Sequence, residues 1–485
     1  MIRKISRKDL IVLVEPGPTQ FGKLGGDPSY DIYTSYKLAA RGIHYVGAAA
    51  KQAGFTNIDY LSQHHGNINS FENRKLLQEA AIVGVSSITR TDPQATKLLD
   101  QYRDKITISG GFGPSFRSEE FAKHSDFVVI GEAEETFPEL LLTLAGERGS
   151  VEDVNGIAFE KNNEVIYTNP RARLSPEKLS IIHPDYDQTT LEGVKTFPIE
   201  DSRGCPKDCN FCTVTKAYGR SFREKSDIWM GDELTRTKSH GQYIFMTGDN
   251  FIANRKRAKR LLEYMVENDL NDKPFVFQST IQLADDSELM DLLWKAGARA
   301  VCLGIESIDD EILNGMNKGY SAQRVIDSVK KIRDYGFWTH GMFIVGEDND
   351  NSTKAKELCG WAPRNVDSAQ FFALIPLPGS DIEKQFKSED RLIYPESDPH
   401  YHLYEGDHVL FKPKNFKNPL ELQKILYEMY ENFYSWTNGI KRVAFSRPWG
   451  HKMIATGLLA YTKFSGRKVL HSPQSIEHVK YLESL

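Results

Sequence analysis

Short apolar runs separated by amphipathic stretches occupy residues 1–150 of the chain. Each run lacks polar alternation, which is typical of a parallel strand buried on both faces. The expected strands are 10–14, 58–61, 81–86, 106–109 and 127–130, with helices over about 35–52 and 93–102. Alternating strands and helices predict an α/β fold with a Rossmann-like, doubly wound parallel sheet.

Small and polar residues follow three of these expected strands, in loops 86–89, 110–113 and 131–136. In a doubly wound sheet, ligands bind beyond the carboxyl ends of the strands, where small residues let the backbone approach closely. The sequence therefore predicts a ligand site at this edge. A domain that holds another cofactor, or nothing, stays open, because fold alone does not establish a ligand.

A second series of strands begins near residue 197, after a predicted hairpin over 156–167 that turns at Asn162-Asn163. The expected strands are 197–200, 243–246, 275–278, 300–306, 339–346 and 368–374, separated by helices such as 286–296 and 321–335. About six β/α units predict a partial (β/α)6 TIM-like barrel. Such a barrel keeps its active site at the carboxyl ends of its strands.

The last hundred residues are expected to form a mostly helical α+β domain. Apolar positions at helical spacing predict a helix over 419–436, and residues 407–411 resemble a strand. The predicted domains are thus 1–150, a hairpin and linker at 151–195, the barrel at 196–385, and 386–485. The tail 441–468 mixes basic and apolar residues, which fits either a peripheral membrane contact or a surface helix.

Composition narrows the function classes. The chain has 485 residues, 40% hydrophobic and 26% charged, with a formal net charge of −5. This small charge argues against broad nucleic-acid binding. The sequence contains no run of 18 apolar residues, the length that a membrane-spanning helix needs. The N-terminus lacks the apolar region of a signal peptide, so export is not expected. Five cysteines, three of them clustered, predict a cytoplasmic location.

Three cysteines at C-x3-C-x2-C spacing, Cys205, Cys209 and Cys212, are the strongest chemical signal. Three thiolates on one loop can bind three irons of a cubane cluster and leave the fourth iron open to a ligand. A structural zinc site usually has four ligands, disulfide frameworks use even cysteine counts, and ferredoxin clusters use four cysteines. An open [4Fe–4S] cluster is therefore favoured, with zinc as the main alternative.

The segment from Ser202-Arg203-Gly204-Cys205-Pro206 through Cys212 resembles the cluster loop of radical S-adenosylmethionine (SAM) enzymes. About 190 residues resemble that superfamily's barrel, and the preceding segment resembles a cobalamin-binding domain. Together they resemble the cobalamin-binding, class B methyltransferase-like radical SAM enzymes. The resemblance implies three cofactors: a [4Fe–4S] cluster, SAM and cobalamin.

The resemblance also implies which residues contact SAM. Asp249 matches an acceptor for the amino group, Glu306 matches a SAM-contacting position, and Lys318 is a candidate partner for the carboxylate. The full predicted SAM set is Phe211, Asp249, Gln278, Ser279, Glu306, Lys318, Ile344 and Gly346. Phe211, Ile344 and Gly346 match positions beside the adenine. The alternative for each is a satisfied polar group or core residue at a barrel mouth.

By the same resemblance, the first domain would hold the corrin and its nucleotide tail. The predicted cobalamin contacts are Ser86, Ser87, Thr89, Gly110, Gly111, Phe112, Gly131 and Glu132. One departure is notable: the D-x-H-x-x-G motif, whose histidine ligates cobalt in many cobalamin domains, is absent. His64-His65-Gly66 lacks a correctly placed aspartate. Cobalt would then have no protein imidazole below it.

The implied activity is methylation of an unactivated carbon. Reductive cleavage of SAM would give a 5′-deoxyadenosyl radical that removes a hydrogen atom, and methylcobalamin would supply the methyl group. The C-terminal region resembles that of enzymes acting on polyprenoid or tetrapyrrole-like molecules, so a hydrophobic small molecule is expected as substrate. The resemblance also implies an external one-electron donor such as flavodoxin or ferredoxin, and no nucleic-acid partner.

Three alternatives compete with methylation. The same cofactors could produce ring formation, hydroxylation or another rearrangement without methyl transfer. A tRNA methylthiotransferase is disfavoured, because extra N-terminal cysteines and a basic C-terminal module are absent. A non-enzymatic iron–sulfur sensor would not need a full barrel. No catalytic residue is assigned. Cys302 and Cys359 are expected as core thiols. His340 is expected to be structural, with a side chain that faces the substrate as the alternative.

Overall fold

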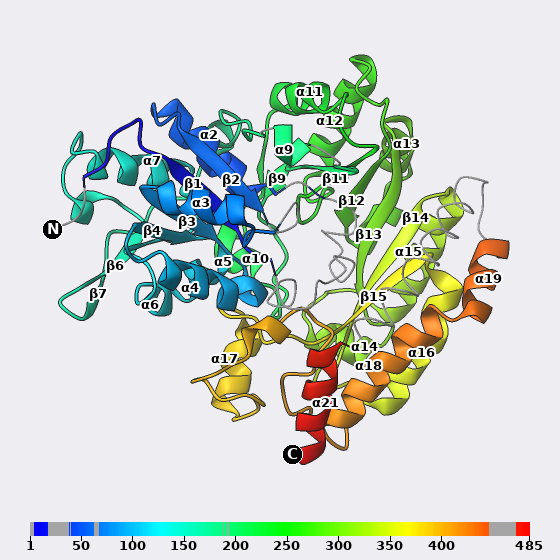
Figure 1. Ribbon diagram of the computed structural model, residues 1–485. Coiled ribbons are helices and arrows are strands. Elements are labelled where there is room, and N and C mark those ends of the chain that lie inside the picture. The colour runs from blue at the N-terminus through cyan, green and yellow to red at the C-terminus, as the bar shows by residue number, and fades with distance from the viewer. Residues whose placement is uncertain are drawn as a thin grey trace. The chain divides into compact units, whose positions relative to one another are not determined.

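The computed structural model describes residues 4–17, 38, 40–62, 67–186, 188–191, 194–445 and 472–485. The chain forms two compact units. The first contains Met1–Pro198, Arg223–Trp229 and Ser239–Gly241, and the second contains Ile199–Phe222, Met230–Lys238 and Gln242–Leu485. Figure 1 labels the elements of both. The division into four domains stays a prediction.

The described strands of the first unit form one sheet in the order β2-β1-β3-β4-β5-β6-β7. They are β1 (Ile11–Glu15), β2 (Ile58–Ser62), β3 (Ile82–Ser86), β4 (Ile106–Gly110), β5 (Phe127–Val129), β6 (Ile157–Lys161) and β7 (Glu164–Tyr167). The pairs from β2 to β5 are parallel, and β6 and β7 add antiparallel. The strand order reverses between β1 and β3, which is where doubly wound sheets bind their ligands.

Both faces of this sheet are covered, as the continuous apolar runs predict. Along β1, Ile11 and Leu13 pack in one core with residues of α2 and α7. Val12 and Val14 pack in a second core with residues of α3 and α4. Successive strand residues face opposite sides, so each β1 side chain enters one of the two cores.

The helices of the first unit connect these strands. They are α2 (Gly42–Gln52), α3 (Phe71–Glu79), η3 (Thr89–Thr91), α4 (Asp92–Gln101), α5 (Phe112–Phe116), α6 (Ser118–Phe121), α7 (Ala133–Leu144), η4 (Val151–Asp153), α8 (Pro176–Leu179) and α9 (Gln188–Leu191). The expected loop over 131–136 is wrong from residue 133 onward, because α7 begins there. Glu134 and Glu135 lie in its first turn, where acidic side chains favour a helix.

The predicted hairpin is present as β6 and β7. Its turn residues Asn162 and Asn163 have φ of 54° and 63°. Two consecutive left-handed residues form the type I′ turn that suits the twist of a hairpin, and asparagine tolerates this conformation. The hairpin extends the sheet beyond β5.

The second unit is built on a parallel sheet in the order β15-β14-β13-β12-β11-β8. Its strands are β8 (Thr196–Ile199, whose last residue lies in this unit), β11 (Tyr243–Met246), β12 (Phe275–Ser279), β13 (Ala298–Glu306), β14 (Trp338–Val345) and β15 (Ser368–Ala373). The pairs from β11 to β15 are all parallel. Strands that neighbour in sequence also neighbour in the sheet, as expected for the predicted six-unit partial barrel (Figure 1).

Helices alternate with these strands and continue beyond them. They are α10 (Val214–Tyr218), α12 (Arg255–Glu267), η5 (Ile281–Asp285), α13 (Ser287–Lys295), α14 (Asp310–Gly315), α15 (Ala322–Tyr335), α16 (Ser352–Asn365), α17 (Asp381–Ser388), η6 (Tyr401–Leu403), α18 (Pro419–Phe433), α19 (Trp436–Phe445) and α21 (Pro473–Ser484). The short strands β9 (Ser202–Arg203) and β10 (Arg223–Glu224) and the helix α11 (Asp227–Arg236) complete the described elements.

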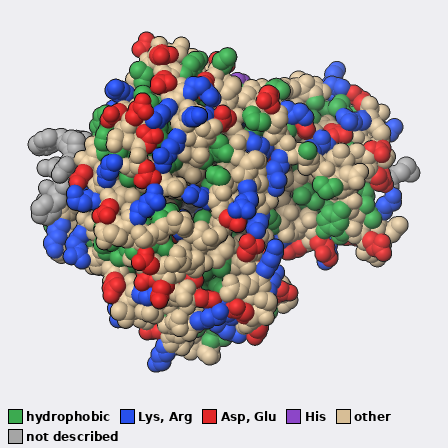
Figure 2. Space-filling model, turned by 180° about the vertical axis from the view of Figure 1, so that it is seen from behind, with side chains coloured by type: hydrophobic (Ala, Val, Ile, Leu, Met, Phe, Trp, Pro, Cys, Tyr) green, Lys and Arg blue, Asp and Glu red, His purple; other side chains and the backbone are tan. Residues whose placement is uncertain are grey.

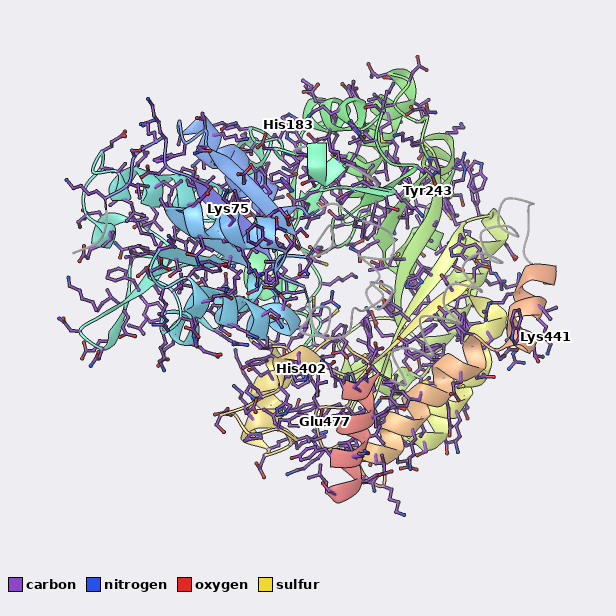
Figure 3. All side chains as sticks on the ribbon, viewed as in Figure 1. Lys75, His183, Tyr243, His402, Lys441 and Glu477 are labelled. Atoms are coloured by element: carbon purple, nitrogen blue, oxygen red, sulfur yellow. The ribbon has the colours of Figure 1, made fainter. Side chains whose placement is uncertain are left out.

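The predicted C-terminal helix is present as α18, which packs on α16 and β15. The expected strand over 407–411 is reduced to one bridge between Leu392 and Phe411. Side chains of the segment before α18 bond α21: the His408 ring bonds Ser475 Oγ at 3.1 Å, and the Tyr394 hydroxyl bonds His478 Nδ1 at 2.7 Å. Figure 3 marks this region by His402 and Glu477. The C-terminal helices thus belong to the barrel unit.

The surface carries charges of both signs. On the face drawn in Figure 2, Lys and Arg side chains lie among Asp and Glu side chains. This mixing accords with the small net charge of −5. Among the described helices, none is long and apolar enough to cross a membrane. Most of the tail 441–468 lies outside the described residues.

The hairpin turn gives a first test. Asn163 has φ 63°, a left-handed conformation that asparagine tolerates because its side chain can hydrogen-bond locally. Alanine lacks that side-chain hydrogen bond, so Asn163→Ala should lower the free energy of unfolding of this unit by about 1 kcal/mol. Asn163→Gly should be neutral or stabilising, because glycine adopts this φ freely. Differential scanning calorimetry of both variants measures the effect. Equal melting temperatures for the Ala and Gly variants would contradict this account of the turn.

Candidate active site

The three-cysteine loop leaves the carboxyl end of the first barrel strand, where the sequence predicted it. Cys205, Cys209 and Cys212 lie between β9 and α10, and each is partly exposed. Gly204 begins the loop at φ 90°, and a Cβ there would collide with the Ser221 carbonyl. A glycine is therefore required immediately before the first cysteine.

The thiols of this loop lie close enough to influence one another electrostatically. Burial raises the pKa of each thiol above its ordinary value, to about 11 for Cys212, and charge on Cys205 and Cys209 contributes to that rise. Among the described residues, no three His, Cys, Asp or Glu side chains converge to hold a single metal ion. Tetrahedral zinc would draw its sulfurs to within about 4 Å of one another, because Zn–S bonds are about 2.3 Å. In a cubane, by contrast, each thiolate binds a different iron, and three cysteines leave the fourth iron open.

A buried carboxylate, Asp201, fixes the base of the cysteine loop. Its side chain accepts hydrogen bonds from Gly248 N at 3.0 Å and Ser202 Oγ at 2.9 Å. Arg257 of α12 pairs with it at 3.2 Å and also donates to its backbone carbonyl at 2.9 Å. Both charged side chains are fully buried. One carboxylate thus joins the cysteine loop to the Gly248-Asp249 loop after β11.

The sequence pattern did not identify this pair. Asp201 directly follows a predicted strand, but its partner lies 56 positions later, on a helix whose bounds the sequence analysis does not give. The available signal was an arginine among the apolar positions of an amphipathic helix, since Arg257 is buried beside Ala258 and Leu261. Long arginine stems commonly occupy such positions, so the pattern alone does not name the partner.

Asp249, Gln278 and Ser279 lie at neighbouring strand ends. Asp249 follows β11 and is close enough to raise the pKa of the Cys205 and Cys212 thiols, after the larger effect of burial. Gln278 and Ser279 end β12, and Gln278 Nε2 lies 3.4 Å from the Gly248 carbonyl. The hydroxyl of Ser279 donates to the Thr280 carbonyl at 3.0 Å. These polar groups therefore lie at the same edge of the sheet as the cysteine loop.

Glu306 and Lys318 form a buried ion pair beside the second cysteine. Lys318 Nζ donates to Glu306 Oε1 at 2.8 Å, and the same ammonium lies 5.9 Å from the centre of the Phe211 ring. Burial lowers the pKa of Lys318, but Glu306, Tyr320 and Cys209 together more than offset it, so the pKa lies above its ordinary range. The ammonium also lowers the pKa of the Cys209 thiol, opposing burial. Four predicted site residues are thus brought together.

The backbone of Glu306 is unusual. It ends β13 with φ 62°, next to a register irregularity after Gly304. A left-handed conformation is costly for a glutamate and persists only where the surroundings impose it, commonly at functional sites. A Cβ on Gly304 would lie 2.9 Å from Glu306 Oε1. The missing side chain at 304 therefore leaves space for this carboxylate.

The predicted adenine contacts on β14 have another explanation within the barrel unit. Gly346 follows β14 at φ 91°, and a Cβ there would lie 2.6 Å from Leu422 and 2.9 Å from Phe411. Packing against these two residues is sufficient to require glycine. Ile344, two residues earlier, is buried. Their contact with SAM stays a prediction.

In the first unit, Ser87 serves a structural role. Its hydroxyl donates to Asp92 Oδ1 at 2.6 Å, and its backbone bonds Gly110 O at 3.0 Å and Gly113 N at 3.1 Å. A Cβ on Gly111, at φ 99°, would lie 2.5 Å from the Ser87 carbonyl. Ser87 therefore links the loops after β3 and β4.

Glu132, another predicted cobalamin contact, is occupied by protein partners. Its carboxylate accepts from Arg223 at 2.8 Å and from Leu174 N at 2.8 Å. The pair with Arg223 is buried. Glu132 thus fixes the loop after β5 and is a positioning residue for it.

Other predicted cobalamin contacts offer small surfaces at the carboxyl edge of this sheet. Ser86 and Gly110 end β3 and β4 and are partly exposed. Gly131 has φ 81° and is exposed, and a Cβ there would have no described atom within 4 Å. Thr89 is nearly buried in η3, and Phe112 begins α5. The set therefore divides into loop-shaping residues and an accessible edge of small residues. His64 and His65 lie outside the described residues.

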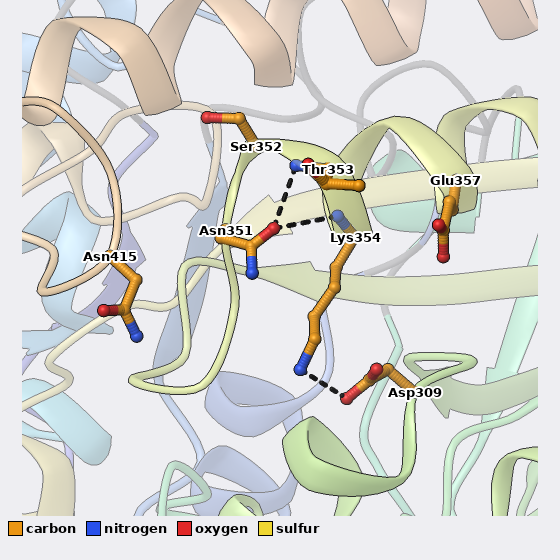
Figure 4. A pocket seen from close by; sticks show the side chains of 7 residues that line it. All are labelled: Asp309, Asn351, Ser352, Thr353, Lys354, Glu357 and Asn415. Carbon is orange, nitrogen blue, oxygen red and sulfur yellow. Dashed lines mark hydrogen bonds and ion pairs between the residues drawn. The ribbon is translucent and has the colours of Figure 1, made fainter.

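A polar surface pocket lies at the start of α16 (Figure 4), and no cysteine lines it. It is lined by Asp309, Asn351, Ser352, Thr353, Lys354, Glu357 and Asn415. Lys354 bonds Asp309 at 3.0 Å, and the Asn351 side chain caps α16. Because these polar groups already have protein partners, the pocket gives no reason to assign it a cofactor.

Comparison with known families matches both units. The family model described as "Radical SAM superfamily" matches residues 199–359, and the model described as "B12 binding domain" matches residues 32–141. The chain belongs to the cobalamin-binding radical SAM enzymes. The predicted family, fold class and cofactors (a [4Fe–4S] cluster, SAM and cobalamin) are thereby confirmed.

Individual relatives agree with this membership. An uncharacterised methyltransferase of Synechocystis is 32% identical over 295 residues, which cover 59% of this chain and 52% of that protein. The bacteriochlorophyllide d C-8(2)-methyltransferase of Chlorobaculum tepidum is 25% identical over 379 residues, covering 75% and 80%. The chain thus spans about half the length of the first relative and four-fifths of the second.

Among solved structures, the radical SAM methyltransferase TsrM of Kitasatospora setae, with cobalamin and a [4Fe–4S] cluster bound, has the same fold. The TM-score is 0.68 at 15% identity, and the match covers 94% of this chain and 100% of that one. At this identity, the likeness concerns the architecture of this cobalamin-binding radical SAM enzyme rather than its residues.

The Asp201–Arg257 pair gives a second prediction. Arg257→Leu leaves a buried carboxylate unpaired, which typically costs about 3–5 kcal/mol. We expect a lower melting temperature and less iron bound per chain after anaerobic reconstitution. Arg255→Leu, on the same helix, breaks an exposed pair with Asp285 and should cost less than about 1 kcal/mol. Similar losses in the two variants would contradict the anchoring role of Arg257.

Asp92 gives a third prediction. Burial raises its pKa to about 6, and Arg117 and Ser87 offset this only in part. Between pH 4 and 6 the folded state therefore binds more protons than the unfolded state, so this group makes stability fall as pH rises. The effect reaches about 3 kcal/mol above pH 6. Asp92→Asn lacks this titration, so its melting temperature should rise relative to wild type between pH 4.5 and 7.

The control for this prediction is Asp104→Asn, at an exposed aspartate of the same unit. Its melting temperature should follow that of the wild type over the whole pH range. Parallel curves for wild type and Asp92→Asn would show that Asp92 does not titrate as described.

Proposed function

We propose that the chain is a C-methyltransferase that uses SAM, a [4Fe–4S] cluster and cobalamin to methylate an unactivated carbon of a largely apolar, ring-containing substrate. The observation that carries this proposal is the three-thiol loop at the carboxyl end of β8, next to the polar groups after β11 and β13. The Chlorobaculum relative supports the substrate class, because its name specifies methylation of a bacteriochlorophyllide carbon.

Cys205, Cys209 and Cys212 would hold three irons and leave the fourth for SAM. Bound together, the cluster and SAM supply a 5′-deoxyadenosyl radical, and cobalamin supplies the methyl group. The protein's part is to position these groups. Asp201 orients the cysteine loop, and the Lys318 ammonium places positive charge beside Cys209, which favours the thiolate that iron requires.

The SAM molecule would be held at the same edge of the barrel. Asp249 is an acceptor for the amino group, and Gln278 and Ser279 are partners for hydroxyl or carboxylate oxygens. Glu306 and Lys318 bond each other and would share their remaining hydrogen-bonding capacity with SAM. Phe211, with Ile344 and Gly346 as further candidates, would pack against the adenine.

Cobalamin would bind at the carboxyl edge of the first sheet. Ser86, Gly110 and Gly131 offer little steric hindrance to a flat macrocycle, with Thr89 and Phe112 on the adjoining segments. Ser87, Gly111 and Glu132 would shape the loops instead of binding the corrin directly.

The remaining partners follow from the chemistry. Reduction of the cluster requires an external one-electron donor, for which flavodoxin or ferredoxin is the proposed class. Reduced thiols and an iron–sulfur cluster suit the cytoplasm. The mixed surface charge supports a small-molecule substrate over a nucleic acid.

Label transfer tests this function. Anaerobically reconstituted protein is given SAM carrying a CD3 group, a chemical reductant and bacteriochlorophyllide d. Mass spectrometry should find 5′-deoxyadenosine and a product in which CD3 replaces hydrogen. Cys209→Ala should reduce both to background, whereas Cys359→Ala should leave both near wild type, because Cys359 lies on α16 and bonds Asn432.

Two results would count against the proposal. A purified protein that binds tetrahedral zinc at the three cysteines, or that takes up no corrin by its visible absorption, lacks the required cofactors. Formation of 5′-deoxyadenosine with a modified but unlabelled product would indicate another radical outcome.

A further inference from the structure

The two faces of the barrel sheet differ in exposure. Phe277, Val301, Leu303, Phe343 and Phe371 are completely buried. The residues that alternate with these along β12–β15, and so face the other side of the sheet, are mostly half-buried. In a sheet of this kind, helices cover the outer face and the other face lines the interior. The half-buried residues therefore line the interior of the partial barrel.

One register line across this inner face consists of hydrogen-bonding side chains. Gln278 of β12 pairs with Cys302 of β13, Cys302 pairs with His340 of β14, and His340 pairs with Ser368 of β15. Gln370 lies two residues further along β15. These five residues, Gln278, Cys302, His340, Ser368 and Gln370, are called the inner row. Figure 1 shows the four strands side by side.

Apolar or small residues border the inner row. The preceding register line contains Val276, Ala300 and Trp338. The following line contains Gly304 and Met342, and Gln370 of the inner row pairs with Met342 there. Further toward the carboxyl edge, Ile344 pairs with Phe372. The interior wall is therefore largely apolar, with a single band of polar groups across its middle.

Hydrogen bonds set the orientation of His340. Trp338 Nε1, which can only donate, bonds Ser368 Oγ at 3.1 Å. His340 Nδ1 lies 2.9 Å from the same oxygen. The Ser368 hydroxyl proton is then available to His340 Nδ1, which places the ring proton on Nε2. His340 also bonds Gln370. The ring is thus fixed by groups on its own strand and on β15.

The inner row is uncharged at neutral pH. Burial lowers the pKa of His340 to about 4 and raises the pKa of the Cys302 thiol to about 12. At the carboxyl edge, the charged groups Glu306 and Lys318 bond each other at 2.8 Å. An anion brought against the row would lose its hydration without meeting a cation from the row itself.

We propose that the inner row is a substrate-recognition site for an uncharged oxygen, a keto, ester or hydroxyl group, on an otherwise apolar ring system. His340 and Gln370 donate and accept the hydrogen bonds, Ser368 is a positioning residue for His340, and the apolar border contacts the ring system. This assignment rests on the proposed function and deepens it. Cys302 and His340 are both partly exposed, which favours the alternative that His340 faces the substrate.

Equilibrium binding of three fluorescent probes tests the proposal. The probes are pyrene, 1-pyrenemethanol and 1-pyrenecarboxylate, added to the holoenzyme without reductant. One hydrogen bond between neutral groups contributes about 0.5–1.5 kcal/mol, so pyrenemethanol should bind about two- to tenfold more tightly than pyrene. The carboxylate should bind more weakly than the alcohol.

Variants localise the binding. His340→Phe should remove the preference for the alcohol while retaining affinity for pyrene, and His340→Gln should restore part of the preference. Ser368→Ala and Gln370→Leu give the same readout if His340→Phe does not fold. The matched control is His402→Phe, a half-buried histidine of η6 in the same unit, which should behave as wild type.

The inference is overturned if the wild type binds the carboxylate best, if it binds none of the probes, or if the inner-row variants keep the full preference for the alcohol. These outcomes are separable from failure of the proposed function, because binding is measured without SAM cleavage. Loss of label transfer with an intact alcohol preference would reject methylation and leave the recognition site in place.

Discussion

The arrangement of the barrel's active edge depends on one buried carboxylate. Asp201 receives hydrogen bonds from the loop after β11, from its neighbour Ser202 and from Arg257. A buried ion pair contributes little net stability, because desolvation of the two charges offsets their attraction. Its value here is positional. The same carboxylate bonds the start of the cysteine loop and the loop that carries Asp249. The three thiols and the Asp249 carboxylate are therefore held in a fixed position relative to one another.

A second constraint acts at the end of β13. Glu306 adopts a left-handed backbone, and its carboxylate is held by Lys318. Both are buried, and Gly304 leaves the space that the carboxylate occupies. The conformational cost at Glu306 is therefore offset by a specific charged partner that also lies beside Phe211 and Cys209. This geometry is pre-organised, because the polar groups already hold their positions before a ligand binds. Binding therefore does not have to order these side chains, which would cost conformational entropy.

Sequence alone predicted the features that are local. Three cysteines within eight residues predict an iron–sulfur cluster, and continuous apolar runs predict strands that are buried on both faces. Features that join distant residues were not predicted. The partner of Asp201 lies on another element, and the inner row exists only because four strands pair in one register. Periodicity gives the face of each residue, but it does not give the register between strands.

The first turn of helix α7 was predicted as a loop for a different reason. Small and polar residues after the expected strand 127–130 indicate a loop, and Glu134 and Glu135 lie in that stretch. In the structure they lie at a helix amino end, where their charge is favourable. Glu132 shows the same limit. The family resemblance predicts it as a cobalamin contact, whereas in the structure its carboxylate pairs with an arginine 91 positions later.

That distant arginine has a practical consequence for dissecting the protein. Residues 223–229 belong to the first compact unit although the cysteines precede them in the chain. Arg223 donates to the Leu174 carbonyl, and Lys225 to the Leu179 carbonyl. A gene fragment that stops at Pro198 would encode every strand of the first sheet but neither of these cations. Swapping this unit between homologues without the cysteine loop therefore requires at least three splice junctions, after Pro198, Phe222 and Trp229. A cut after Pro198 alone separates Glu132 from its counterion Arg223.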